Sequence, residues 1–325
     1  MSFRAIVARK AEGGAVSATI ETVSEHMLGD VSVAVEWSSV NYKDAIAILT
    51  DQIIKSFPLI PGIDFAGTVT QSDDPRYAVG DKVAATGHAL GVSHNGGFAQ
   101  QARVKADWLV KLPGAISTRN AMAIGTAGFT AMLSVLALEH GGITPARGPV
   151  LVTGASGGVG SIATAILAKL GYRVIASTGK AEAEYLTRLG ASEILNRADL
   201  SGQGRPIAPD RWPAAIDTVG GQTLVNVIGQ TGYRGVVTAC GFVGGRDLPA
   251  SVLPFILRNI TLAGIDSVNA PETLRQIAWQ RLANDLDTDT LASTISEVGL
   301  ADVPAIAGAM VQGRLKGRTL VNVNA

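Results

Sequence analysis

Cysteine is almost absent from this sequence, and its scarcity excludes several kinds of site. Cys240 is the only cysteine among 325 residues, so no intrachain disulfide and no multi-cysteine zinc site can form. It ends an apolar run with no obvious base beside it, so we interpret it as a small buried hydrophobe. The four histidines lack compact metal-ligand spacing, although His88 and His94 share one glycine-rich loop. We therefore predict no metal site.

The chain also lacks an excess of either charge and a long uninterrupted apolar run. Its 27 basic and 27 acidic side chains cancel, which leaves no basic excess for a nucleic-acid backbone or an anionic membrane. The first residues lack the apolar segment of a signal peptide, and no later stretch resembles a membrane span. We expect a cytoplasmic protein with no nucleic-acid partner and no membrane partner.

The length of the chain is sufficient for two domains, each with its own core. Turn residues in the first third separate short β-like runs at 3–8, 31–37, 67–70, 82–85 and 98–104. This pattern predicts a compact β domain or a partial barrel. Helical periodicity begins near Ala121, and strand-like and helix-like segments then alternate, which predicts a doubly wound parallel sheet. The strand-like residues 319–323 are expected to rejoin the first domain.

The most informative segment is residues 150–160, where the apolar run VLV breaks into TGASGGVG and continues with helical periodicity. In such a turn, glycines let the backbone approach a pyrophosphate, and free amides at the helix N-terminus face its charge. The spacing is GxxGxxG rather than the commoner GxGxxG, so the surrounding strand and helix carry the prediction. A purely structural turn is the alternative. The predicted contacts are Ser156, Gly157, Gly158, Val159 and Gly160.

The next strand, expected at 173–176, is followed by a turn that bears on the choice of cofactor. An NAD site usually has Asp or Glu about 20 residues after the glycines, but this turn holds Ser177, Thr178, Gly179 and Lys180. Two hydroxyls and an ammonium suit a 2′-phosphate, so we predict NADPH as the cofactor. The alternative is that Lys180 is an ordinary solvated charge.

Several further segments occur in a fixed order around the glycine turn. Residues 38–44 read SSVNYKD, 57–67 FPLIPGIDFAG and 125–132 GTAGFTAM, and PFILRN at 254–259 and GIDSV at 264–268 follow. With these motifs, the chain resembles the zinc-independent, quinone-oxidoreductase-like branch of the medium-chain dehydrogenase/reductases over nearly its whole length. Within that branch it is most similar to the NADPH-dependent acryloyl-CoA reductases.

The resemblance implies an α/β protein with two domains and an active site in the cleft. A GroES-like β-rich catalytic domain is expected at 1–117 and 293–325, and a Rossmann domain with a doubly wound parallel sheet at 118–292. A homodimer joined through the Rossmann domains is also implied. The matching cofactor contacts are Tyr42, Ser156 to Gly160, Ser177 to Lys180, Arg197, Phe242, Ile256 and Ser267.

Some positions depart from the family pattern. Lys180 stands where Arg is commoner, which removes a bidentate fork, and Phe242 stands where a smaller apolar residue is usual. The zinc-dependent relatives have Cys at the place of Asn41 and a His-Glu pair near Ile63 and Asp64. The absence of both agrees with the prediction of no metal.

Without a metal, hydride addition to a conjugated carbon suits the site better than oxidation of an alcohol. Negative charge then develops on a carbonyl oxygen, and the α-carbon needs a proton. Tyr42 is the predicted catalytic donor because an unperturbed phenol, with a pKa of about 10, is protonated at neutral pH. The alternative is that Tyr42 only packs against the nicotinamide. Asp44 is expected to cap a helix, and Asp64 to accept from nearby backbone amides.

The predicted function is NADPH-dependent reduction of the C=C bond of a short enoyl-CoA thioester, acryloyl-CoA to propionyl-CoA above all. A quinone or alkenal reductase acting on another conjugated carbonyl is the alternative within the enzymes, and a noncatalytic NADPH-binding protein is the alternative outside them. The phosphates of a CoA substrate would require cations. The candidates are Lys43, Lys55, Arg119 and Arg258.

Overall fold

The computed structural model describes residues 2–24, 28–179 and 184–325, which form two compact units. Unit 1 comprises Met1–Thr126, Val268–Ala283 and Ile295–Ala325, and unit 2 comprises Ala127–Ser267 and Asn284–Thr294. Residues 268–283 thus pack with unit 1, although the sequence-based division places them within 118–292. Arg275 explains this placement: its buried guanidinium donates to the carbonyl of Thr86 at 3.1 Å and to that of Val268 at 2.9 Å.

Unit 1 contains a seven-stranded sheet in the order β14-β15-β3-β4-β5-β7, with β6 paired to β3. Val31, Val33 and Val35 alternate into the core along β3, as expected for a sheet that is covered on one face. β15 pairs antiparallel with β3, which confirms that the C-terminal strand rejoins the first part of the chain. The strands are β3 (Val31–Val40), β4 (Asp64–Ser72), β5 (Lys82–Thr86), β6 (Gln101–Val104), β7 (Leu109–Lys111), β14 (Ile295–Gly299) and β15 (Arg318–Asn322).

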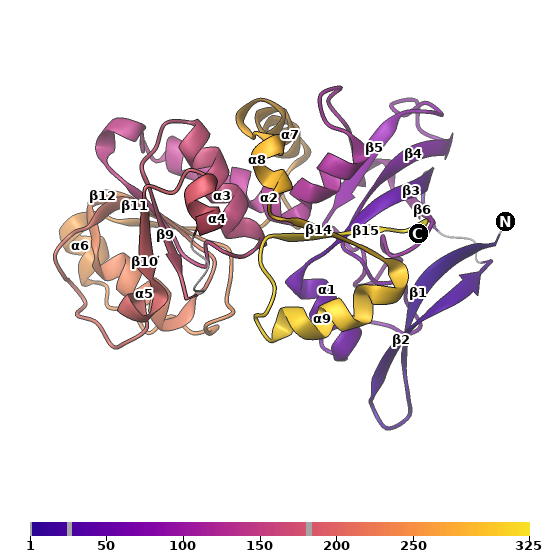
Figure 1. Ribbon diagram of the computed structural model, residues 1–325, viewed down its shortest axis with the longest axis horizontal. Helices are drawn as coiled ribbons and strands as arrows, with labels where there is room; N and C mark the ends of the chain where they lie inside the picture. The colour runs from indigo at the N-terminus through magenta and orange to yellow at the C-terminus, as the bar shows by residue number, and fades with distance from the viewer. Residues whose placement is uncertain (1, 25–27, 180–183) are drawn as a thin grey trace. The chain divides into compact units, whose positions relative to one another are not determined.

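A separate antiparallel hairpin, β1 (Phe3–Lys10) and β2 (Val16–Val23), belongs to the same unit (Figure 1). Two helices, α1 (Tyr42–Leu49) and α9 (Val303–Val311), pack against each other. α1 directly follows β3, so the end of that strand determines where the helix begins. The remaining short elements of unit 1 are the 3-10 turns η1 (Ala106–Trp108) and η4 (Leu300–Asp302).

Unit 2 contains a six-stranded parallel sheet in the order β10-β9-β8-β11-β12-β13. Its strands β9, β10, β11 and β12 are labelled in Figure 1. The chain runs outward from β8 first to one side and then to the other, as in a doubly wound sheet. The strands are β8 (Val150–Val152), β9 (Val174–Thr178), β10 (Glu193–Asn196), β11 (Trp212–Asp217), β12 (Thr231–Ala239) and β13 (Thr261–Gly264). The connecting elements are α3 (Gly158–Lys169), α4 (Glu184–Arg188), α5 (Gly221–Gly229), α6 (Leu253–Arg258), α8 (Thr288–Ala292), η2 (Pro145–Arg147) and η3 (Arg197–Leu200).

Two helices, α2 (Thr118–His140) and α7 (Glu272–Asp285), contain a boundary between the units. α2 is interrupted at Gly125, whose φ of 51° and ψ of −160° are not helical. By length and hydropathy α2 would qualify as a membrane span, but 83% of its most apolar window is buried in the protein. A core helix satisfies the same criteria.

Candidate cofactor and active site

The glycine turn lies at the carboxyl end of β8 and leads into α3. Gly154 has a φ of +57°, and a Cβ there would lie 2.3 Å from the Thr218 hydroxyl oxygen. A Cβ on Gly160 would lie 2.5 Å from the Gly154 carbonyl oxygen, so the first turn of α3 packs directly on the loop. Gly157, the N-cap residue, has no side chain to satisfy the first helical amides. The first amides of α3 therefore lack a capping side chain, which is the local geometry that an anion-binding turn requires.

The second predicted segment lies beside the glycine turn. The Thr178 hydroxyl donates to the Ser156 hydroxyl oxygen at 3.1 Å, which joins the two segments. β9 extends to Thr178, two residues beyond the predicted end at 176, because Ser177 and Thr178 pair with Leu195 and Asn196 of β10. Lys180, the predicted cation, lies outside the described residues.

Arg197 lies against the end of this segment. A Cβ on Gly179 would lie 2.2 Å from Nε of Arg197 and 2.8 Å from its Cζ, so the guanidinium passes directly over the glycine backbone. Pairing of β9 with β10 brings the start of η3 to this place. Arg197, which the resemblance implies as a cofactor contact alongside Lys180, thus places a planar donor group at the end of β9.

Three other predicted contacts lie in the later part of unit 2, outside its strands. Phe242 follows β12 and is 56% exposed, Ile256 is on α6 and is 70% exposed, and Ser267 follows β13. The guanidinium of Arg246 lies 5.5 Å from the centre of the Phe242 ring. No sequence pattern singled out Arg246, because the contact depends on the loop conformation between them.

Tyr42 is the first residue of α1 and is 40% exposed. The residues around the start of α1 form a buried polar network. The Asp64 carboxylate, fully buried, accepts from the Ser39 hydroxyl at 2.9 Å, the Asn41 side-chain amide at 2.8 Å and the Thr126 backbone N–H at 2.8 Å. It also accepts from the Thr126 hydroxyl at 2.5 Å. Asp64 therefore does accept from a backbone amide, and side chains supply the other three hydrogen bonds.

Arg318 brings a buried cation into the same network. It donates to the Asn41 side-chain oxygen at 3.0 Å, the Ser39 hydroxyl oxygen at 2.8 Å and the Ala123 carbonyl at 3.0 Å. Its guanidinium is 4.0 Å from the Asp64 carboxylate and is 3% exposed. Burial lowers the pKa of Arg318, and the nearby Asp64 and Asp44 oppose this effect. Sequence reasoning missed Arg318, since nothing near it in the chain marks it as functional.

Asp44 completes the buried network and confirms the predicted capping role. Its carboxylate accepts from the backbone N–H of Asn41 and that of Ile63, each at 2.8 Å. Burial, followed by the charge of Asp64, raises the pKa of Asp44 to about 7.

This raised pKa predicts that the stability of the protein falls as the pH rises. The folded state holds the proton of Asp44 more tightly than the unfolded state, so the stabilisation is complete below about pH 4 and is lost as pH rises through about 7. We expect Asp44→Asn to flatten this dependence by about 2–4 kcal/mol between pH 4 and pH 8. Urea unfolding of both proteins across this range measures it. A parallel fall in both would assign the dependence to other groups.

The two histidines of the glycine-rich loop contact one aromatic ring. The His88 ring stacks on Trp108 at 5.5 Å, and the His94 ring meets it edge-on at 5.0 Å. Burial lowers the pKa of His88 to about 4, and both His94 nitrogens lie within 2.9 Å of backbone carbonyls. Within residues 2–24, 28–179 and 184–325, no three His, Cys, Asp or Glu side chains gather as metal ligands.

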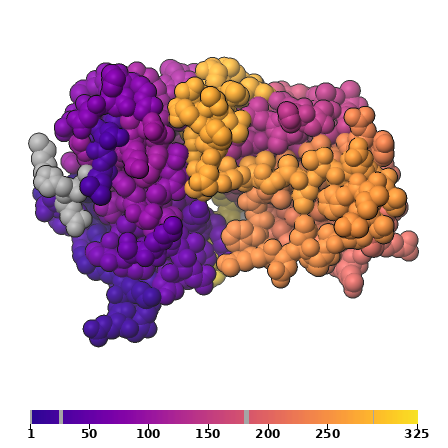
Figure 2. All heavy atoms as spheres, turned by 180° about the vertical axis from the view of Figure 1, so that it is seen from behind, coloured from indigo at the N-terminus to yellow at the C-terminus, as the bar shows by residue number. Residues whose placement is uncertain are grey.

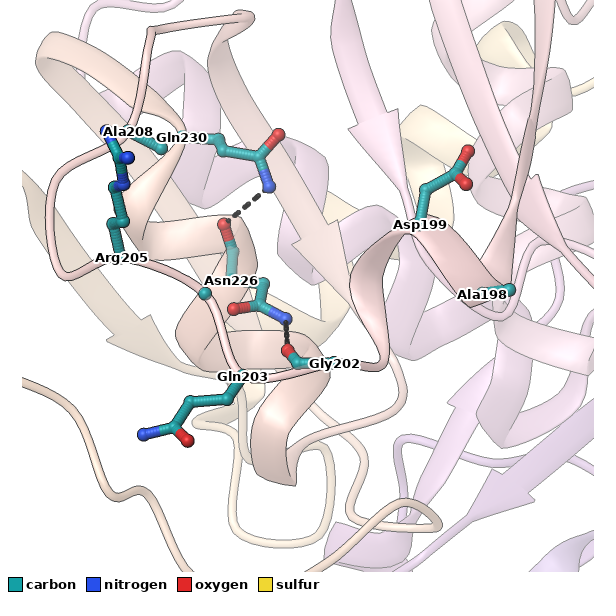
Figure 3. Close-up of a pocket in the computed structure, with 9 residues that line it drawn as sticks. Ala198, Asp199, Gly202, Gln203, Arg205, Ala208, Asn226 and Gln230 are labelled. Carbon is teal, nitrogen blue, oxygen red and sulfur yellow. Dashed lines mark hydrogen bonds between the residues drawn. The ribbon is translucent and has the colours of Figure 1, made fainter.

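Each unit contains a cavity lined by described residues. One of about 430 Å³ in unit 1 is lined by His88, Glu272 and Arg275, among others. The other, about 210 Å³, lies between η3 and α5 in unit 2, where Gln230 donates to the carbonyl of Asn226 and Asn226 to that of Gly202 (Figure 3). Neither lining includes Tyr42 or the glycine turn, so the candidate site rests on the backbone geometry described above.

Two of the four proposed CoA-binding cations are engaged elsewhere. The Arg258 guanidinium donates to the carbonyls of Gly229, Thr231 and Ala208, so it joins α6 to β12. Arg119 forms an ion pair with Glu297. Lys43, half-buried on α1 beside Tyr42, and Lys55, exposed, stay candidates.

Two family models match the chain. Residues 28–114 match the alcohol dehydrogenase GroES-like domain, and residues 158–284 match the zinc-binding dehydrogenase domain. An acrylyl-CoA reductase of Ruegeria pomeroyi is 50% identical over 99% of this chain and 100% of its own length. The chain belongs to the medium-chain dehydrogenase/reductase family. The predicted resemblance and the predicted fold class are thereby confirmed.

Other members of this family are similarly close. A probable acrylyl-CoA reductase of Escherichia coli is 51% identical over 96% of this chain and 98% of its own length. A solved structure of Escherichia coli YhdH with bound NADPH has a TM-score of 0.96 and 50% identity, and covers 98% of this chain and 100% of its own. Bacillus subtilis YhfP, solved with NAD, also has a TM-score of 0.96, at 44% identity and with 99% of this chain and 100% of its own covered.

The family includes zinc enzymes, but the residues around Asn41 do not fit a zinc ion. Zinc in proteins prefers thiolate and imidazole ligands, and Ser39, Asn41 and Asp64 offer only oxygen and amide groups. The Arg318 guanidinium already donates to two of these residues and would repel a dication. These side chains are therefore already paired with a fixed organic cation.

Proposed function

We propose that this chain catalyses the NADPH-dependent reduction of the C=C bond of a short enoyl-CoA thioester, with acryloyl-CoA as the principal substrate. The observation that carries the proposal is the 50% identity with an acrylyl-CoA reductase over nearly the whole of both chains. The glycine turn, Arg197 and Tyr42 supply the groups that the reaction requires. The ligand is thus a small molecule.

Each group of residues has a separate role in the proposed reaction. When bound, NADPH supplies the hydride. Addition of hydride to the β-carbon leaves negative charge on the thioester oxygen, and the α-carbon must then gain a proton. Tyr42 donates that proton from its phenol, and solvent restores it. The amides of Gly158, Val159 and Gly160 hold the pyrophosphate, and Ser156 and Thr178 keep the two binding segments together.

The cofactor preference rests on Arg197 and on Lys180, which lies outside the described residues. The guanidinium over Gly179 is suited to pair with a 2′-phosphate, and the described residues 177–179 include no acidic side chain. A relative at 44% identity was solved with NAD, so the preference needs a direct test.

We predict that Arg197→Glu weakens NADPH binding about 10- to 100-fold and changes NADH binding by less than about threefold. The introduced carboxylate repels the 2′-phosphate, which NADH lacks. Lys180→Glu is expected to act in the same direction. Titration of intrinsic fluorescence with each nucleotide measures the effect, and Arg188→Glu on α4 serves as a surface charge control. Equal losses for both nucleotides would show that the phosphate lies elsewhere.

The experiment that tests the function follows nucleotide oxidation with acryloyl-CoA, crotonyl-CoA and a 1,4-quinone. We expect NADPH-selective turnover with acryloyl-CoA to exceed that with the quinone. Turnover of the quinone alone would favour the quinone or alkenal reductase. Tight NADPH binding without turnover of any acceptor would favour the noncatalytic NADPH-binding protein.

We further propose that the enzyme is zinc-independent and cytoplasmic. The proposed domains are a GroES-like catalytic domain at 1–117 and 293–325 and a Rossmann domain at 118–292, from which residues 268–283 depart because they pack with unit 1. The poor fit of the Asn41 surroundings to zinc supports the first point. The activity of protein dialysed against a chelator provides the test: a loss that zinc restores would refute it.

We also propose a homodimer joined through the Rossmann domains. β13 is an edge strand of the parallel sheet, and exposed apolar side chains gather in the segment before it. The orange part of the chain, which includes this segment, forms much of the visible surface of unit 2 (Figure 2). The exposed side chains are Phe242, Val243, Leu248, Val252, Leu253, Ile256 and Leu257. Light scattering on the purified protein distinguishes a dimer from a monomer.

A further inference from the structure

The interruption of α2 at Gly125 creates two helix ends inside unit 1. The buried side chains of Asp64 and Arg318 form hydrogen bonds with backbone groups at these ends. Arg318 donates to the carbonyls of Ala123, at 3.0 Å, and Met122, at 3.4 Å, at the end of the first helical part. Asp64 accepts from the N–H of Thr126, at the start of the second. A cation at a helix C-terminus and an anion at an N-terminus are the favourable placements.

The side chains of Asp64 and Arg318 pack so closely against Gly125 that no larger residue fits at this position. A Cβ at this position would lie 2.6 Å from the Arg318 guanidinium, 2.6 Å from the Asp64 carboxylate and 2.9 Å from the Ser39 hydroxyl. With a φ of +51°, the backbone is also in the region that favours glycine. The helix break, the two charges and the end of β3 therefore form one closely packed unit.

Asn41 is where this unit meets α1. Its side-chain oxygen accepts from Arg318 at 3.0 Å, and its amide donates to Asp64 at 2.8 Å. Both ends of the side chain are held, the residue is 9% exposed, and its backbone N–H is bound by Asp44. The next residue is Tyr42, which begins the helix. The backbone position of Tyr42 is thus determined by a residue that charged partners hold from two directions.

We propose that Asn41, held between Asp64 and Arg318, is a positioning residue that orients Tyr42 for proton donation. This inference rests on the proposed function, in which Tyr42 is the donor. Proton transfer requires the donor within hydrogen-bond distance of the α-carbon, and a displacement of about 1 Å can cost roughly 100-fold in rate. A partly exposed phenol on an eight-residue helix needs such an anchor, because its own side chain is not enclosed.

The test is a double-mutant cycle on kcat for acryloyl-CoA reduction, with Asn41→Ala, Tyr42→Phe and the double variant. We expect Asn41→Ala to lower kcat about 10- to 100-fold in the unaltered protein and less than about twofold in the Tyr42→Phe background. The NADPH dissociation constant should stay within about twofold of its original value. Asp287→Ala, which removes the cap of α8, is the matched control and should leave kcat unchanged.

Equal losses of kcat in both backgrounds would overturn the inference, because Asn41 would then act independently of Tyr42. An unchanged kcat in the Asn41→Ala variant would also overturn it. A silent Tyr42→Phe would overturn both the donor role and the inference. If Asn41→Ala does not fold, Ser39→Ala replaces it in the same cycle, since Ser39 bonds to both Asp64 and Arg318. If only the quinone is reduced, the proposed substrate fails, and the cycle is run with the quinone.

Discussion

Tyr42→Phe is expected to lower kcat for acryloyl-CoA reduction by about 10²- to 10⁴-fold, the usual contribution of a positioned general acid. The substitution removes only the hydroxyl, so the ring keeps its packing and the start of α1 keeps its backbone hydrogen bonds. The KM for NADPH should therefore change little. Stopped-flow measurement of NADPH oxidation at saturating substrate separates hydride transfer from product release.

A second tyrosine of unit 1 provides a control for this expectation. Tyr77→Phe removes a different phenol of unit 1, one whose hydroxyl donates to the Leu109 carbonyl at 2.6 Å, and should lower stability without a large loss of kcat. An unchanged kcat in Tyr42→Phe would instead favour the alternative in which the ring only packs against the nicotinamide.

Gly160→Ala is expected to weaken NADPH binding by roughly 5- to 150-fold, corresponding to about 1–3 kcal/mol of overpacking. The new methyl group would lie 2.5 Å from the Gly154 carbonyl oxygen and 2.6 Å from the Ala155 Cα. Both atoms belong to the backbone of the turn that faces the pyrophosphate, so relief of the clash must move the binding loop itself. Fluorescence titration with NADPH measures the loss.

A control glycine in the same unit makes this result specific. A methyl group on Gly202 would meet no described atom within 4 Å, and the φ of this residue is not positive, so Gly202→Ala should leave NADPH binding unchanged. Similar affinities for the Gly160→Ala variant and the original protein would show that the turn is structural and that the nucleotide binds elsewhere.

The elements predicted most accurately from the sequence are those that a pattern of neighbouring residues specifies. The run at 150–160 predicted a strand, a glycine turn and a helix, and β8 and α3 lie there. The end of β9 was predicted two residues too early, because Ser177 and Thr178 are polar and their burial depends on pairing with β10. The capping role of Asp44 was also predictable, since its partner Asn41 is three residues away.

The contacts around Tyr42 could not be predicted from the sequence, because they join residues that are far apart in the chain. Asp64 joins residues that are 25, 23 and 62 positions away, and Arg318 reaches Asn41 across 277 positions. No periodicity or local spacing relates these side chains. They converge because β15 pairs with β3 and because α2 is broken at Gly125.

The motifs in their order were enough to predict the family. The alternation of strand-like and helix-like segments was enough to predict the parallel sheet, because such signals act within a few residues of each other. The dinucleotide-binding role of the glycine turn stays a prediction. Only the tertiary structure determined the surroundings of each charged side chain. Arg318 becomes a buried partner of Asp64, and Arg197 comes to lie over Gly179, only when distant strands have paired. The solvent exposure of a charged side chain depends on which helices and strands pack around it, and these elements come from remote parts of the chain.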